Sequence, residues 1–235
     1  ANERHQDMGI MLFEIGKVYL PREGGLPEEP TMLCGVIGGA QCGPSWSGES
    51  SPLDFFYAKG ILQTLFAHLG IEVAFEAAED NRMLGGKTAS VLLEGGSVGI
   101  LGELDPNITA RFDICAEPVC LFEIEIEKLV SFTDRLQTVQ PIPRYPSIDR
   151  DLALVVDEDI TAQKIQDIIC SFSQLGKATL FDVYQGKQIP QGKKSLAFAL
   201  RYQSPDRTLT DEEVDKTQRK ILTRLEKEVG ATLRQ

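Results

Sequence analysis

Hydrophobic residues recur along this sequence with two periods, one typical of strands and one typical of helices. In the first 136 residues, runs that alternate or are wholly apolar predict strands at 12–20, 32–37, 73–77, 89–93, 98–101 and 119–126. Apolar residues at helical spacing predict a helix over 54–69, which Gly70 ends. A shorter helix begins at Asp105 and Pro106, because aspartate suits the cap and proline the first turn. This part of the chain therefore combines strands with helices.

A proline-rich stretch separates this part from the rest of the chain. Residues 137–147 hold three prolines in eleven residues, which is typical of a linker between domains. Beyond it, the pattern predicts strands and helices in the order βαββαβ, at 151–156, 161–172, 178–184, 195–202, 210–229 and 231–233. This order is that of a ferredoxin-like unit. The sequence thus predicts an α+β chain of two domains, 1–136 and 148–235, joined by the linker 137–147.

The charge of the chain is unevenly distributed between these two domains. The net charge of the whole chain is −11, which by itself argues against binding to nucleic acid. Residues 1–140, however, hold 9 Lys and Arg against 21 Asp and Glu, a net charge of −12, whereas residues 141–235 hold 15 against 14, a net charge of +1. The acidic total therefore belongs to the first domain and does not exclude a nucleic-acid partner for the second.

Cysteine usage and the N-terminal residues indicate where the protein works. The five cysteines are an odd number, and the N-terminal segment lacks the basic stretch and long apolar run of a signal peptide. We therefore expect reduced thiols and a cytoplasmic location. No run of about 18 apolar residues is present, so we expect no membrane partner. Because the sequence lacks an initial Met and enters its first strand early, we expect a fragment of a longer chain.

The stretch 178–202 has features of a surface for single-stranded nucleic acid. Its two predicted strands flank a loop that contains glycine and proline, which end the strands, and lysines, which make the loop positively charged. Strict alternation places Leu180, Asp182 and Tyr184 on one face of the first strand. An aromatic ring on a sheet offers a platform for a base, and lysines beside it meet phosphates. An ordinary hairpin with a solvated loop explains the same residues, and the pattern alone favours this second interpretation.

The sequence shows no constellation that predicts catalysis or metal binding. Lys87 follows two glycines as in a phosphate-binding loop, but Asn81 replaces the upstream glycine of that motif and the following residues predict a strand. The two histidines, His5 and His68, are too few for a histidine-containing metal site or a Ser/His/Asp triad. The alternating acids at 123–127 are more typical of a solvated strand face than of a magnesium site. We therefore expect no catalytic and no metal-binding residue in this chain.

Three stretches of the second domain are distinctive. They read RYPSIDRDLALVVDEDI (144–160), LFDVYQGKQIPQGKKSLAFAL (180–200) and YQSPDRTLTDEEV (202–214). These stretches closely resemble the ferredoxin-fold anticodon-binding domain at the C-terminus of bacterial phenylalanyl-tRNA synthetase β subunits. In the first domain, FEIGKVYLP, DFFYAKGIL and VGILGELDP resemble the domain that precedes it in those subunits. The resemblance implies that the first domain is a non-catalytic class II synthetase-like core, an antiparallel sheet with flanking helices, truncated at its N-terminus.

The resemblance also implies what the longer enzyme does. In such ligases the α subunit activates phenylalanine with ATP and Mg²⁺ and charges the tRNA, whereas the β subunit contributes the non-catalytic core, editing and tRNA binding. The implied partners of this chain are therefore tRNA(Phe), the α subunit and a second β subunit in an α2β2 assembly, and no cofactor is expected in the chain itself. An alternative remains open, in which the chain serves mainly in subunit assembly and binds little nucleic acid of its own.

The resemblance further implies three tRNA-binding residues. Tyr184 matches the aromatic residue that stacks on an anticodon base, Asp182 matches an acid that accepts from the N–H donors of a guanine, and Ser195 matches a small polar neighbour. Arg207 is a weaker candidate, because it is equally suited to hold the turn before the last helix. Charge alone adds five candidates for phosphate contacts, which are Lys187, Lys193, Lys194, Arg150 and Arg201.

Overall fold

The structure of the chain is a computed structural model that describes residues 9–40, 52–114, 116–133 and 142–234. It divides into two compact units, Ala1–Thr138 and Val139–Gln235, and each unit has a hydrophobic core of its own. The division falls within the predicted linker, of which residues 137–141 lie outside the described ranges. No helix in the described ranges is long and apolar enough to cross a membrane.

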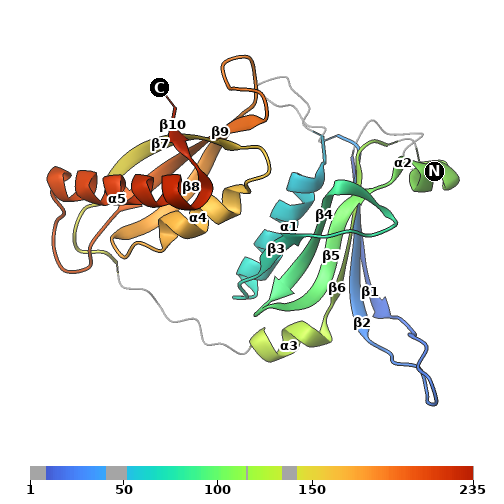
Figure 1. Cartoon of the computed structure of the whole chain (residues 1–235). Coiled ribbons are helices and arrows are strands. Elements are labelled where there is room, and N and C mark those ends of the chain that lie inside the picture. Colours follow the sequence, from blue (N-terminus) through green and yellow to red (C-terminus); the bar gives the residue numbers. More distant parts are fainter. Residues whose placement is uncertain (1–8, 41–51, 115, 134–141, 235) are drawn as a thin grey trace. The chain divides into compact units, whose positions relative to one another are not determined.

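The first unit is built on a six-stranded antiparallel sheet with the strand order β1-β2-β6-β5-β4-β3 (Figure 1). Its strands are β1 (Ile10–Lys17), β2 (Thr31–Gly38), β3 (Ala74–Ala77), β4 (Met83–Leu93), β5 (Gly96–Leu104) and β6 (Val119–Glu125). Its helices are α1 (Phe55–His68), α2 (Pro106–Arg111) and α3 (Glu127–Thr133). The predicted strands are all present, and the antiparallel sheet with helices that the resemblance implies is confirmed.

Strand β4 differs most from its prediction. It begins at Met83, well before the predicted start at residue 89. Its first residues include two glycines and do not alternate, and the pairing with β5 changes register between Met83 and Thr88. Gly86 lies there with a φ of +80°, a backbone conformation that glycine adopts without strain. A strand with such an irregularity carries no simple period-two signal.

Helix α1 packs one apolar stripe into the core of the first unit. Asp54 caps it, its carboxylate accepting a backbone N–H of the first turn at 3.0 Å. Ala58, Leu62 and Phe66 recur every four residues and are almost completely buried in the same apolar cluster. Gly70 follows the helix with a φ of +69°, as expected of a residue that ends a helix.

The second unit is a four-stranded antiparallel sheet with the strand order β10-β7-β9-β8 and two helices (Figure 1). Its strands are β7 (Ile148–Asp157), β8 (Leu175–Tyr184), β9 (Lys193–Tyr202) and β10 (Thr232–Leu233), and its helices are α4 (Ala162–Cys170) and α5 (Asp211–Val229). Along the chain these elements follow one another as βαββαβ, which confirms the predicted ferredoxin-like unit.

Both helices of the second unit pack on the same face of its sheet. One buried cluster joins Ile165 of α4 and Ile221 and Leu225 of α5 to Leu196 and Phe198 of β9. Residues of a strand point alternately to the two faces of its sheet. The residues between these buried positions of β9 therefore lie on the face that α4 and α5 do not cover.

Helix α5 has defined ends, and these position the short strand β10. Thr210 and Glu213 form the predicted capping box, in which each side chain accepts the backbone N–H of the other residue. Gly230 ends the helix with a φ of +63° and turns the chain back towards the sheet. Thr232 and Leu233 then pair with β7. The residue that follows β10 is thereby placed at this edge of the sheet.

Candidate nucleic-acid interface

The sheet face that α4 and α5 leave uncovered, which we call the open face, has small side chains at its centre. In the register of β7 and β9, Ala153 lies opposite Ala197 and Asp151 lies opposite Ala199. The open face consists of Asp149, Asp151, Ala153, Val155 and Asp157 of β7, Lys193, Ser195, Ala197, Ala199 and Arg201 of β9, Lys177, Thr179, Asp182 and Tyr184 of β8, Thr232 of β10, and Arg234 after β10.

A β-bulge in β8 corrects one part of the prediction. Strict alternation places Leu180 on the same face as Asp182, but Leu180 lies opposite the buried Phe198 and packs against the core under the helices. The pairing then shifts by one residue at Phe181, so that Asp182 lies opposite Ala197 on the open face. The predicted common face is therefore wrong for Leu180, because a bulge adds a residue that alternation cannot anticipate.

Beyond the bulge, the three residues that the resemblance implies for anticodon binding share the open face. Tyr184 lies opposite Ser195 in the register, and Asp182 precedes Tyr184 by two residues on the same strand. The Asp182 side chain is exposed and that of Tyr184 is half-buried, whereas Ser195 is only 1% exposed. The ring of Tyr184 and the carboxylate of Asp182 are thus accessible to a ligand, whereas Ser195 is buried.

Arg234 joins this group, although the sequence pattern does not single it out. The centre of its guanidinium lies 5.1 Å from the centroid of the Tyr184 ring. The same guanidinium donates to Ser195 Oγ and to Gln188 Oε1, each at 3.4 Å. Its backbone N–H donates to the Ala153 carbonyl at 3.0 Å, which fixes the residue at the edge of β7. One arginine therefore connects β8, β9 and the loop between them.

The predicted lysines of the β8–β9 loop differ in how they are engaged. Lys187 is exposed, and it makes no ion pair with the residues that the structure describes. Lys193 pairs with Asp157 at 2.6 Å, and the Lys194 ammonium donates to the Glu158 carbonyl at 2.8 Å. Lys187 is therefore the lysine most available to a phosphate group.

The two predicted arginines lie on different faces of the sheet. Arg201 is on the open face, where it donates to Asp149 at 2.9 Å and 3.2 Å and lowers the pKa of that carboxyl group. Arg150 lies opposite Leu200, a core residue, and its guanidinium pairs with Asp211 at the start of α5. The structure therefore does not bring Arg150 together with the other candidates.

Arg207 holds the turn before α5, the alternative role that its position suggests. Its guanidinium donates two hydrogen bonds to the Glu213 carboxylate, at 2.7 Å and 2.6 Å. These bonds, together with the backbone N–H of Thr210, lower the pKa of Glu213 to about 2. Arg207 thus secures the capping box of α5.

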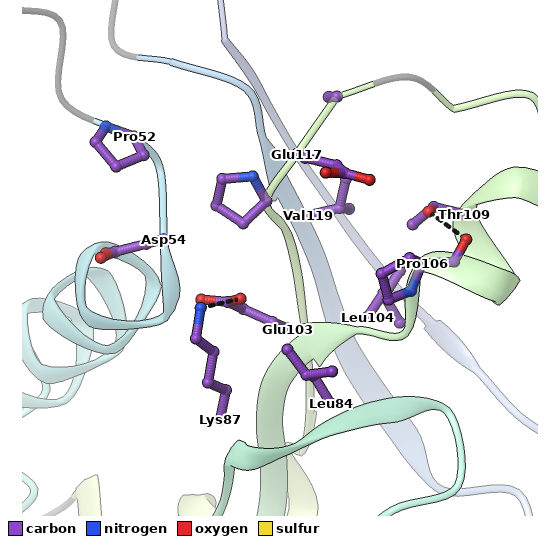
Figure 2. Close-up of a pocket in the computed structure, with 12 residues that line it drawn as sticks. Pro52, Asp54, Leu84, Lys87, Glu103, Leu104, Pro106, Thr109, Glu117 and Val119 are labelled. Carbon is purple, nitrogen blue, oxygen red and sulfur yellow. Dashed lines mark hydrogen bonds and ion pairs between the residues drawn. The ribbon is translucent and has the colours of Figure 1, made fainter.

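The first unit has a pocket of about 410 Å³ near the starts of α1 and α2 (Figure 2). Lys87 and Glu103 meet there, with 2.7 Å between the ammonium and the carboxylate, and this bond raises the pKa of Lys87. Glu103 is buried and also accepts the Phe55 N–H at 3.2 Å. Lys87 lies within β4, and the residues after it continue this strand as predicted, whereas a phosphate-binding loop would lead into a helix. Together these bonds tie β4 and β5 to the start of α1.

The acids of β6 and the start of α3 have structural partners. Glu123 pairs with Arg82 at 3.0 Å, and Glu125 pairs with Lys128 at 2.7 Å. The Glu127 carboxylate accepts the backbone N–H of Thr31. Among the described residues, no group of three or more His, Cys, Asp and Glu side chains is placed to hold a metal ion, and His5 lies outside them.

The second unit is thus a ferredoxin-like domain whose open face carries an aromatic ring, a carboxylate and basic groups, which are the chemical features of sheet domains that bind unpaired bases. Residues 143–234 match the family model of the ferredoxin-fold anticodon binding domain, and residues 1–126 match that of the phenylalanyl tRNA synthetase beta chain CLM domain. The chain belongs to the phenylalanyl-tRNA synthetase beta chain family, and the resemblance seen in its sequence is confirmed.

Several curated proteins are similar to this chain over its whole length. It is 43% identical over 234 residues to the phenylalanine–tRNA ligase beta subunit of Dehalococcoides mccartyi (strain CBDB1), covering 100% of this chain and 29% of that protein. It is 39% identical to the beta subunit of Halalkalibacterium halodurans, covering 99% of this chain and 30% of that protein. The beta subunit of Geobacillus kaustophilus is also 39% identical, with 99% and 29% covered. The chain thus spans less than a third of the length of these relatives.

Proposed function

We propose that this chain is part of the β subunit of a phenylalanine–tRNA ligase, and that the open face of its second unit binds the anticodon region of tRNA(Phe). The observation that carries the proposal is the placement of Asp182, Tyr184 and Ser195 on one face by the bulge in β8. The match of residues 143–234 to an anticodon-binding domain supports it.

The chemistry of the open face suits unpaired bases. Tyr184 offers its ring to a base, and such stacking contributes about 1–3 kcal/mol per base. The exposed Asp182 carboxylate is an acceptor for the N–H donors of a guanine, which only an unpaired nucleotide presents freely. The exposed Lys187 of the β8–β9 loop supplies positive charge for a phosphate that flanks the base, whereas Lys194 lies opposite Val156 on the other face and is bound to the Glu158 carbonyl. An anticodon loop presents bases of this kind.

Subunit assembly is a second function, which the exposed apolar residues of β1 favour. β1 is an edge strand of its sheet, and Leu12 and Phe13 on it are 63% and 75% exposed. Large apolar side chains on an exposed edge strand mark a surface that another chain covers. We infer that the first unit contacts the α subunit or the second β subunit of an α2β2 assembly. The ATP- and Mg²⁺-dependent chemistry then belongs to the α subunit, and this chain is non-catalytic.

A binding experiment separates the two functions. The 235-residue chain is titrated at low ionic strength with the fluorescently labelled anticodon stem–loop of tRNA(Phe) and with the same stem–loop carrying an unrelated anticodon. We expect binding of the first RNA and a weaker affinity for the second, because the open face reads a base. Equal affinities would contradict base recognition, and an absence of binding to both RNAs would leave assembly as the function of the chain.

A further inference from the structure

Arg234 lies where three parts of the open face meet. Its guanidinium is close enough to contact the Tyr184 ring of β8, the Ser195 hydroxyl of β9 and the Gln188 amide of the intervening loop. A lysine in this place has a single ammonium, whereas the planar guanidinium donates to two acceptors and stacks on a ring at the same time.

We propose that Arg234 is a positioning residue that holds the Tyr184 ring in the orientation in which it stacks on a base. The guanidinium covers one face of the ring, and the base takes the opposite face. Because the same guanidinium donates to Gln188, it also ties the β8–β9 loop, which carries Lys187, to the edge of the sheet. This inference rests on the proposed function of the open face.

The surroundings of Ser195 support this role. Ser195 is 1% exposed although it lies on the face without helices, and Arg234 donates to its hydroxyl. A buried hydroxyl that loses its partner destabilises the arrangement around it. The hydrogen bond to Ser195 thus holds the guanidinium against the sheet, and the backbone hydrogen bond to Ala153 holds the main chain of Arg234. A group fixed at both ends is suited to fix the ring beside it.

The loop backbone at Gly186 passes close to the same ring. A Cβ atom at this position would lie 2.4 Å from the Tyr184 hydroxyl oxygen and 2.6 Å from the adjacent ring carbon. The loop backbone therefore approaches the hydroxyl end of the ring as closely as only a glycine allows. The ring thus has the loop backbone at its hydroxyl end and the Arg234 guanidinium at its face, and a pre-oriented side chain loses less entropy when it binds.

A double-mutant cycle tests whether Arg234 acts through Tyr184. The affinity of the 235-residue chain for the anticodon stem–loop of tRNA(Phe) is measured for the wild type, Arg234→Gln, Tyr184→Ala and the double variant. We expect Arg234→Gln to weaken binding about fivefold, the scale of a cation–π contact. In the Tyr184→Ala background the same change has less than about half that effect, because the ring it positions is gone. Equal losses in both backgrounds, or an unchanged or tighter affinity of Arg234→Gln, would overturn the proposal.

Two further variants separate position from charge. Arg234→Lys keeps the charge but cannot bridge the ring and both acceptors, so most of the loss is expected to remain. Full affinity in Arg234→Lys would mean that charge alone matters. Arg219→Gln removes the same charge from the exposed surface of α5, away from the open face, and serves as the matched control.

The ring signals of Tyr184 provide a readout that needs no RNA. In a chain with ¹³C-labelled tyrosine, Tyr184→Phe identifies the Tyr184 resonances among the five tyrosines. Arg234→Gln is expected to shift these resonances, and Arg219→Gln is expected to leave them in place. If the wild type binds no RNA, the proposed function fails while the ring signals still decide the positioning role. Unchanged ring signals in Arg234→Gln would overturn it.

Discussion

The two faces of the sheet in the second unit differ in the size of their side chains, although the same strands supply both. On the helix-covered face, β9 carries Leu196, Phe198, Leu200 and Tyr202, each at most 1% exposed. On the open face, the central alternate positions of the same strand are the small residues Ser195, Ala197 and Ala199, with Lys193 and Arg201 at its two ends. One strand thus stabilises the fold through one face and leaves room for a ligand on the other. Substitutions on the two faces should therefore change different properties.

The largest expected effect comes from the helix-covered face. Phe198 is completely buried between the sheet and the helices. Phe198→Ala removes these contacts and leaves a cavity, so we expect the free energy of unfolding to fall by about 3–5 kcal/mol. Urea denaturation measures this change. The matched control is Ala199→Ser on the open face, and a similar loss in both variants would contradict the division between the two faces.

A smaller effect of opposite sign is expected at Tyr202. This residue is also completely buried, and its hydroxyl group has no hydrogen-bond partner among the described residues. Burial raises its pKa to about 12. Tyr202→Phe removes the unsatisfied hydroxyl and keeps the ring, so we expect the free energy of unfolding to rise by about 1 kcal/mol. A destabilised Tyr202→Phe variant in thermal or urea denaturation would show that the hydroxyl has a partner in solution.

The smallest effect distinguishes two lysines near the open face. Lys187 is exposed without an ion pair in the described structure, whereas Lys193 is bound to Asp157. Lys187→Ala should reduce the slope of log affinity against log salt by about 0.7, the value for one phosphate contact to a single strand. Lys193→Ala should reduce it less, because its ammonium already has a carboxylate partner. The same reduction in both variants would show that Lys193 leaves Asp157 when RNA binds.

The sequence pattern predicts the fold better than the details of the open face. The order of strands and helices and the capping box at Thr210 follow from local periodicity and capping chemistry, which each segment carries in itself. The face of Arg150 follows from the sequence, because Arg150 lies two residues before Leu152 and four before Leu154 and therefore shares the helix-covered face with these apolar residues.

Two features of the open face depend on pairing between distant segments. The adjacent apolar residues Leu180 and Phe181 interrupt the alternation in β8, but the bulge there is defined only when β8 is aligned with β9. Arg234 reaches Tyr184 because β10 pairs with β7. Local patterns contain no information on which strands lie side by side, so they indicate an irregularity in β8 but predict neither the pairing around the bulge nor the contact of Arg234 with Tyr184.

The measurement that tests the account most directly compares Tyr184→Ala with Val183→Ala in binding to the tRNA(Phe) anticodon stem–loop. The two residues are neighbours in β8, but Val183 lies opposite Leu196 and so belongs to the other face. We predict that Tyr184→Ala weakens binding by about 1–3 kcal/mol, the value of one stacked base, and that Val183→Ala leaves it unchanged. Equal affinities of the wild type and Tyr184→Ala would contradict the assignment of the open face as the tRNA-binding surface.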